Sequence, residues 1–121
     1  MSVDRKKINK QLDKLTKDIV RQRDGNECQH CFVYCEGSGR HVSHVIPVSA
    51  GNKLRWEPLN MKILCYHCHI NWWHKNPMEA SAWFAEAFPD RWEYIQANRG
   101  IQKFSIAELL ELVDKYKSML K

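Results

Sequence analysis

The chain has 121 residues, 44% of them apolar, which is enough for one domain with a modest core. It has no apolar run of about eighteen residues, which excludes a membrane-spanning helix, and its polar start lacks the apolar segment of a secretory signal. We therefore expect a cytoplasmic protein, where reducing conditions make its five cysteines better metal ligands than disulfide partners.

Residues 4–23 are expected to form a basic amphipathic helix. Its apolar positions have helical spacing and are Ile8, Leu12, Leu15 and Ile19. The cations with the same spacing, offset by two residues onto the opposite face, are Lys10, Lys14, Lys17 and Arg21. The net charge of +5 arises within residues 1–23, because the later basic and acidic residues balance. A cationic row of this kind predicts contacts with nucleic-acid phosphates, and hence DNA as a partner.

The middle segment, residues 27–75, holds every Cys and His of the chain. Residues 40–46 are predicted to form a short strand, and residues 61–64 a second strand that returns antiparallel. Residues 66–75 lack Gly and Pro and are predicted to be helical. The order expected for this segment is therefore strand, strand, helix.

Two Cys-x-x-Cys pairs enclose most of that segment. Cys28 and Cys31 form the first pair, and Cys65 and Cys68 form the second. Four thiolates presented by two tight turns suit a closed tetrahedral zinc site that supports structure. A redox pair is the alternative interpretation, but no surrounding strand–helix–strand pattern supports it. Cys35 is a spare thiol with less suitable spacing.

Residues 76–121 are expected to be helical. Residues 76–79 combine an N-cap, a proline and a glutamate, and Asp90 can cap a further short helix that Gly100 ends. A capping box at residues 105–108 starts the last helix, whose apolar face suits either the core or a homodimer. The fold class predicted is mostly helical α+β, organised as a single domain over residues 1–121.

The order of three further residues points to a known group of enzymes. His44, Asn60 and His69 follow one another, interleaved with the two Cys pairs. On these motifs residues 28–77 resemble the zinc-containing HNH (ββα-metal) endonucleases. Residues 54–60, together with Trp72 and Asn76-Pro77, are similar to phage recombination nucleases of the NinG (Rap) type. The resemblance continues loosely to about residue 100 and leaves out the N-terminal helix.

The resemblance implies a metal-dependent endonuclease with a zinc-stapled ββα-metal core. It would hydrolyse DNA phosphodiester bonds, with the branched intermediates of recombination as candidate substrates. The resemblance assigns His44 as general base at the end of the first strand, Asn60 as the residue that orients that strand or the base, and His69 as a ligand of a catalytic Mg²⁺ or Mn²⁺. These residue types suit the chemistry, because neutral imidazole accepts a proton near pH 7 and a cation offsets charge on the phosphate.

One position departs from the HNH pattern. Ser43 stands where many members carry a metal-binding Asp, Glu or His. His41 is the favoured substitute, and His74 is a further candidate that a regular helix would place about 140° from His69. Arg55 is a candidate DNA contact. The alternatives to an enzyme are a non-catalytic zinc module that binds nucleic acid and a protein-interaction adaptor.

Overall fold

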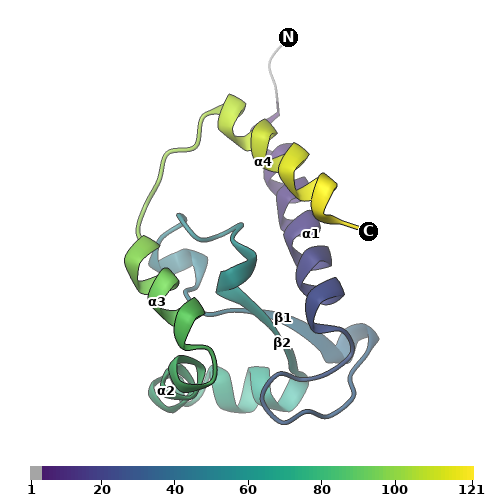
Figure 1. Cartoon of the computed structure of the whole chain (residues 1–121), viewed down its shortest axis with the longest axis vertical. Coiled ribbons are helices and arrows are strands. Elements are labelled where there is room, and N and C mark those ends of the chain that lie inside the picture. The colour runs from purple at the N-terminus through teal and green to yellow at the C-terminus, as the bar shows by residue number, and fades with distance from the viewer. Residues whose placement is uncertain (1–3) are drawn as a thin grey trace.

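The computed structural model describes residues 4–121, and Figure 1 shows the arrangement of its elements. In chain order they are α1 (Arg5–Asp24), β1 (Arg40–His44), β2 (Met61–Cys65), the π-helix η4 (His67–Trp73), α2 (Pro77–Ala87), α3 (Pro89–Asn98) and α4 (Ile106–Met119). Short 3₁₀ turns lie between them. The fold is thus mostly helical with one small sheet. No helix within the described range is long and apolar enough to cross a membrane.

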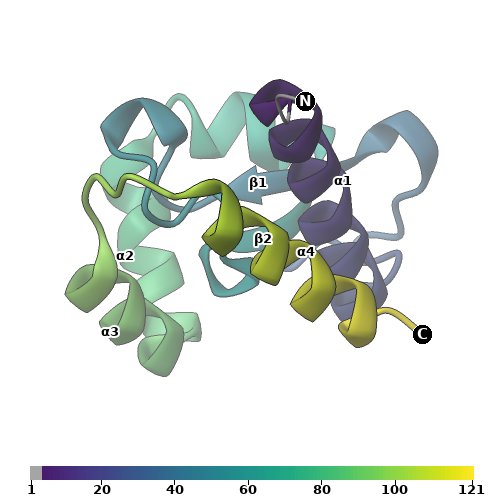
Figure 2. The ribbon, with the colours of Figure 1, turned by 90° about the horizontal axis from the view of Figure 1, so that it is seen from above.

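Helices α1 and α4, from opposite ends of the chain, lie side by side and share a core (Figures 1 and 2). The predicted apolar stripe of α1 is buried in that core. The α4 residues that pack against it are Leu109, Val113 and Tyr116. The Tyr116 hydroxyl also donates a hydrogen bond to the carbonyl of Trp56. The apolar face of α4 is therefore used inside the chain.

Helix α1 has clear chemical reasons to begin and end where it does. The Asp4 carboxylate caps it by accepting hydrogen bonds from the amides of Lys6 and Lys7. Gly25 ends it at φ 69°, in the left-handed region that favours glycine. The cationic row is only partly free, because Lys14 and Arg21 both bind the Asp18 carboxylate, at 2.6 and 2.9 Å.

Strands β1 and β2 pair antiparallel, with Arg40 opposite Cys65 and His44 opposite Met61. β1 ends at His44, and the expectation that it continues to residue 46 was wrong. The next pair in the same register, Val45 and Asn60, keeps one bond, from the Val45 amide to the Asn60 carbonyl at 2.8 Å. Asn60 belongs to the 3₁₀ turn Pro58–Asn60, and its side chain binds the Ile46 amide in place of a backbone partner, so the ladder goes no further.

The segment after β2 is helical, as predicted, but it is not a regular α-helix. Residues 67–73 form a π-helix, and the His74 amide donates to the carbonyl of His69, five residues earlier, at 3.2 Å. Such wide turns are rare and occur often at functional sites. The predicted separation of about 140° between His69 and His74 was therefore wrong, because a five-residue turn brings both onto one side.

The capping box that starts α4 is confirmed, since the Ser105 hydroxyl accepts from the Glu108 amide at 3.1 Å and the Glu108 carboxylate accepts in return at 3.0 Å. The predicted start of α2 is also confirmed, since the helix begins at Pro77 with Asn76 at the N-cap position, although the Asn76 side chain makes no cap bond. The predicted cap of α3 was wrong. Helix α3 starts at Pro89, whose fixed φ suits the first helical position, so Asp90 lies inside its first turn; α3 ends at Asn98, before Gly100.

Candidate functional site

The two Cys-x-x-Cys turns, which we call the knuckles, bring their four cysteines into one cluster, as the spacing predicted. The sulfurs of Cys28, Cys31, Cys65 and Cys68 all lie within 4.8 Å of one another. The Cys31 and Cys65 sulfurs are 3.7 Å apart, against about 3.8 Å for the edge of a tetrahedron with zinc–sulfur bonds of about 2.3 Å. The cluster therefore fits a structural zinc ion. Cys35 lies outside it, buried in a separate apolar cluster.

Backbone amides complete the zinc knuckles. The amide of Cys68 points at the Cys65 sulfur at 3.5 Å, and the amide of Gln29 donates to Ile63 of β2 at 2.9 Å. Burial raises the pKa of Cys28, but amides of the two knuckles outweigh burial and lower that pKa to about 7. The first knuckle is thus tied to the sheet, and its sulfur is prepared for the thiolate form that zinc binds.

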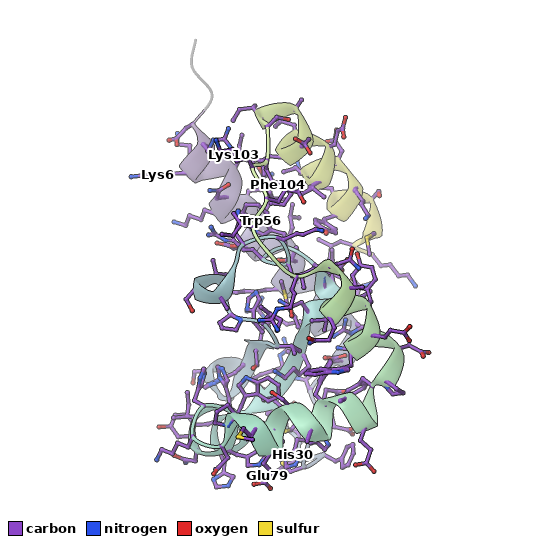
Figure 3. The ribbon with its side chains drawn as sticks, turned by 90° about the vertical axis from the view of Figure 1, so that its left-hand side faces the viewer. Lys6, His30, Trp56, Glu79, Lys103 and Phe104 are labelled. Atoms are coloured by element: carbon purple, nitrogen blue, oxygen red, sulfur yellow. The ribbon has the colours of Figure 1, made fainter. Side chains whose placement is uncertain are left out.

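His30, to which the sequence assigned no role, braces the zinc cluster. Its ring stacks on Trp72 with centroids 3.7 Å apart, and its Nδ1 lies 3.3 Å from the Cys68 sulfur. The Nδ1–H can donate to that sulfur, which accepts readily as a thiolate. Figure 3 shows His30 next to Glu79, far from Trp56 and Lys103. Only the fold reveals this contact, because nothing in the spacing of His30 and Trp72 indicates it.

A pocket of about 410 Å³ lies beside the sheet, and we call it the histidine pocket. The titratable side chains that line it are His44, His69 and His74. His44 stands at the end of β1, and His69 lies in the π-helix directly after Cys68. The structure therefore places two of the three predicted site histidines in one pocket. His41, the third, does not line it.

His44 is held by a backbone carbonyl. Its Nε2 lies 3.2 Å from the carbonyl oxygen of Arg55, which can only accept, so Nε2 carries the hydrogen and Nδ1 is free in the neutral ring. Burial lowers the pKa of His44 from its ordinary value of 6.5, more than the Arg55 bond raises it, and the charge of Lys62 lowers it further. His44 is thus kept neutral near pH 7.

Asn60 is fully buried directly behind His44. Its Oδ1 accepts from the Ile46 amide at 2.9 Å, and its Nδ2 donates to the carbonyls of Ile46 and Leu54 at 3.0 and 3.2 Å. Asn60 does not line the histidine pocket. Its hydrogen bonds tie Ile46, two residues after the end of β1, to the loop at Leu54.

Three histidines form a chain of contacts through His69. The Nδ1 atoms of His41 and His69 are 2.8 Å apart, and the Nε2 atoms of His69 and His74 are 3.0 Å apart. The Nε2 of His41 lies 2.9 Å from the Ser38 carbonyl. Burial, followed by the charges of His74 and His41, lowers the pKa of His69 to about 4. His69 therefore offers one nitrogen to each neighbour.

A fully buried lysine, Lys62, lies next to Ser43. The Lys62 ammonium nitrogen donates to the Ser43 hydroxyl at 2.9 Å and lies 3.1 Å from the centroid of the Trp73 ring. Burial holds the pKa of Lys62 well below its ordinary range. Lys62 could not be recognised as a site residue from the sequence, because a lysine in a short strand normally points to solvent. Ser43 is thereby occupied as a hydrogen-bond acceptor.

A carboxylate of α1 holds the loop that contacts His44. The Asp13 carboxylate binds the Arg55 guanidinium through two bonds of 3.1 and 2.9 Å, and it accepts a third from the Trp56 indole at 2.8 Å. Trp56 is only 5% exposed and belongs to the core. Arg55 therefore has an internal partner, in addition to its predicted role as a DNA contact.

Comparison with known proteins identifies the family of the chain. A family model described as the bacteriophage lambda NinG protein matches residues 2–121. The match includes helix α1, which the resemblance in the sequence had left out. A search of curated proteins and a search of solved structures found no match. Because the family model spans nearly the whole chain, the protein belongs to the family of the bacteriophage lambda NinG protein.

Proposed function

We propose that this member of the NinG family is a metal-dependent DNA endonuclease built on a zinc-stapled HNH core. The observation that carries the proposal is that His44, from the end of β1, and His69, from the π-helix, line the same pocket. The order β1, β2, helix and the zinc cluster that joins its two ends also support it.

His44 has the properties of a general base. The Arg55 carbonyl fixes its tautomer, so Nδ1 is the nitrogen that can take a proton from an attacking water. Asn60 straps the residues that follow His44, and Asp13 holds the side chain of Arg55. The three residues together orient one imidazole beside the pocket, which is the preorganisation that proton transfer from a bound water needs.

The tautomers of the histidine chain favour His69 and His74 as the pair that would hold the catalytic metal. His41 donates from Nε2 to the Ser38 carbonyl, so its Nδ1 can accept from the Nδ1–H of His69. The Nε2 lone pair of His69 then faces the Nε2 of His74. His41 becomes the orienting acceptor behind a ligand, a common arrangement at metal sites. This assignment replaces His41, the favoured ligand in the sequence analysis, with His74.

The imidazole nitrogens of the histidine pocket fit a divalent metal ion, and they favour some divalent ions over others. Among the described residues that line it there is no carboxylate, and imidazoles are the ligands on offer. Mg²⁺ favours oxygen ligands, whereas imidazole suits later first-row ions. The bound ion would stabilise negative charge on the phosphate and on the leaving oxygen. We therefore propose Mn²⁺ or a later ion ahead of Mg²⁺.

Cleavage of DNA tests the proposed function. Supercoiled plasmid and synthetic linear, forked and four-way DNA are incubated with Mg²⁺, Mn²⁺, Co²⁺ or Ni²⁺. We expect metal-dependent cleavage by the wild type and a loss of about 10²–10⁴-fold in His44→Ala, the usual contribution of a general base. His67→Ala is the matched control, because His67 is exposed and lies outside the pocket. Full activity of folded, zinc-loaded His44→Ala would contradict the mechanism.

The metal assignment has its own measurement. Manganese binding, followed by calorimetry in the zinc-loaded protein, should be lost in His69→Ala and strongly weakened in His74→Ala. His41→Ala should bind about 10–100-fold more weakly, as expected for a residue that orients a ligand. A larger loss in His41→Ala than in His74→Ala would return His41 to the ligand position.

A non-catalytic nucleic-acid-binding module is the second candidate. The observation that favours it is Ser43, which stands at the position of a usual ligand and accepts a hydrogen bond from buried Lys62. A module of this kind would bind DNA with strong salt dependence and would cleave none of the substrates with any of the four ions.

A further inference from the structure

A second pocket, of about 490 Å³, lies between the start of α1 and the segment that leads into α4. We call it the cationic groove. Its polar lining residues are Arg5, Asn9, Asn52, Arg55, Gln102 and Lys103. Figure 3 shows Lys103 and Phe104 near Trp56 at the α1 end of the molecule, away from the zinc knuckles. The groove shares no lining residue with the histidine pocket and contains none of the four clustered cysteines.

The charge of the groove has one sign. Three of its lining residues are cations and three are amides, and no carboxylate lines it among the described residues. Asp13, just outside, offsets the charge of Arg55. The Arg5 guanidinium donates to the Phe104 carbonyl at 2.7 Å, which fixes its position, and it forms no ion pair with the described residues. Lys103 forms no ion pair within residues 4–121. The groove therefore suits an anion.

An amide in the groove lacks an internal partner. The Oδ1 of Asn9 is buried and has no hydrogen-bond donor among residues 4–121. Buried polar atoms are nearly always satisfied, so an orphan at a pocket wall indicates a missing partner. A side-chain amide can present either its oxygen or its NH₂ group. Asn9 can therefore bind a sugar hydroxyl, or turn to donate to a phosphate oxygen.

The groove is connected to the histidine pocket through Arg55. The side chain of Arg55 lines the groove, and its carbonyl accepts the hydrogen bond from His44. Helix α1 makes the same connection, because Arg5, Asn9, Asp13 and Lys17 follow at four-residue intervals and so form one ridge of neighbouring side chains. The charges of Lys17 and Asp13 both act on the pKa of His44. This ridge of α1 thus leads from the groove toward His44.

We propose that the cationic groove binds the sugar–phosphate backbone of the DNA strand next to the bond at His44. The inference rests on the proposed function, because it places the groove on the DNA backbone next to the bond that the proposed endonuclease would cleave. Guanidinium, ammonium and amide groups are the usual phosphate contacts, and such contacts position DNA without reading its sequence. Trp56, at 5% exposure, is too buried to stack on a base. The cations and amides of the lining therefore favour the sugar–phosphate backbone as the ligand.

The test measures DNA binding without a catalytic metal, so that it does not depend on cleavage. Binding of a fluorescent 20-base-pair duplex to the zinc-loaded protein is followed between 50 and 200 mM KCl. Lys103→Gln should lower the slope of log K against log salt by about 0.9, and Arg5→Gln with Lys103→Gln by about 1.8. The control is Arg99→Gln with Lys117→Gln, two exposed cations outside the groove, and its slope should match the wild type.

Lysine acetylation gives a second readout on the unaltered protein. Bound duplex should protect Lys103, and Lys117 should react equally with and without DNA. Unprotected Lys103 together with an unchanged salt slope in Lys103→Gln would overturn the proposal that the groove binds DNA, even if the protein cleaves DNA. Protected Lys103 and a lowered slope in a protein that cleaves no substrate would support the groove and overturn the proposed function instead.

Discussion

Replacing Asn60 with alanine is expected to lower the free energy of unfolding by about 3 kcal/mol. The side chain is fully buried and satisfies three backbone groups, the amide and carbonyl of Ile46 and the carbonyl of Leu54. A buried group left without a partner costs about 1–3 kcal/mol. We take the lower end for each, because the neighbouring loop can shift and the carbonyls keep a second lone pair, which gives about 3 kcal/mol in sum.

Urea unfolding of the zinc-loaded protein measures this loss. For a slope of about 2 kcal/mol per molar urea, the midpoint should fall by about 1.5 M. Asn98→Ala is the matched control, because the Asn98 amide donates one exposed bond to the Tyr94 carbonyl, and it should stay within about 0.5 kcal/mol of the wild type. The same loss is expected for Asn60→Asp, which keeps the acceptor for Ile46 and places an oxygen against two carbonyls. An Asn60→Ala protein as stable as the control would refute the strap.

Three further predictions concern the zinc, the base and the basic helix. Cys65→Ser should lose zinc by mass spectrometry and unfold by circular dichroism, since structural zinc supplies folding free energy, whereas Cys35→Ser should keep its zinc. The rate of cleavage should rise with pH through a pKa below 6.5, because burial lowers the pKa of His44. The same lowered pKa affects folding: the stability that neutral His44 contributes is complete above pH 6.5 and is lost as the pH falls through the pKa of the folded state. A profile rising only above pH 7 would contradict this. Lys10→Gln with Lys17→Gln should lower the slope of log K against log salt for DNA binding by about 1.8. Replacing Lys14 and Arg21, which share the Asp18 carboxylate, should lower that slope less, and equal effects would contradict the prediction.

Much of the local structure could be predicted because it depends on near neighbours. The spacing of apolar residues set the buried face of α1, and a cap and a glycine set its ends. The two Cys pairs were enough to predict the cluster of four sulfurs, since a two-residue spacing brings each pair together. The box at Ser105 and Glu108 formed as predicted, because its bonds span only three residues.

The candidate site was only partly predictable. The order of His44, Asn60 and His69 indicated the residues but not their arrangement, which depends on the partners of each side chain. Asn60 lies behind the pocket because its amide matches backbone groups that the loop happens to present. His74 joins His69 because the turn between them is a π-turn, and residue pattern alone favours the commoner α-helix.

Other features followed from packing between distant segments. α4 covers α1, so its apolar face belongs to the core, and Asp13 of α1 holds Arg55, forty-two residues away. Lys62 is buried because the π-helix and α2 close over β2 and set an aromatic ring against its ammonium group. By itself the sequence determined the order of most elements and the cluster of four cysteines, which rest on short-range geometry. Only the tertiary structure decided which side chains share a pocket, because that depends on how the finished elements pack.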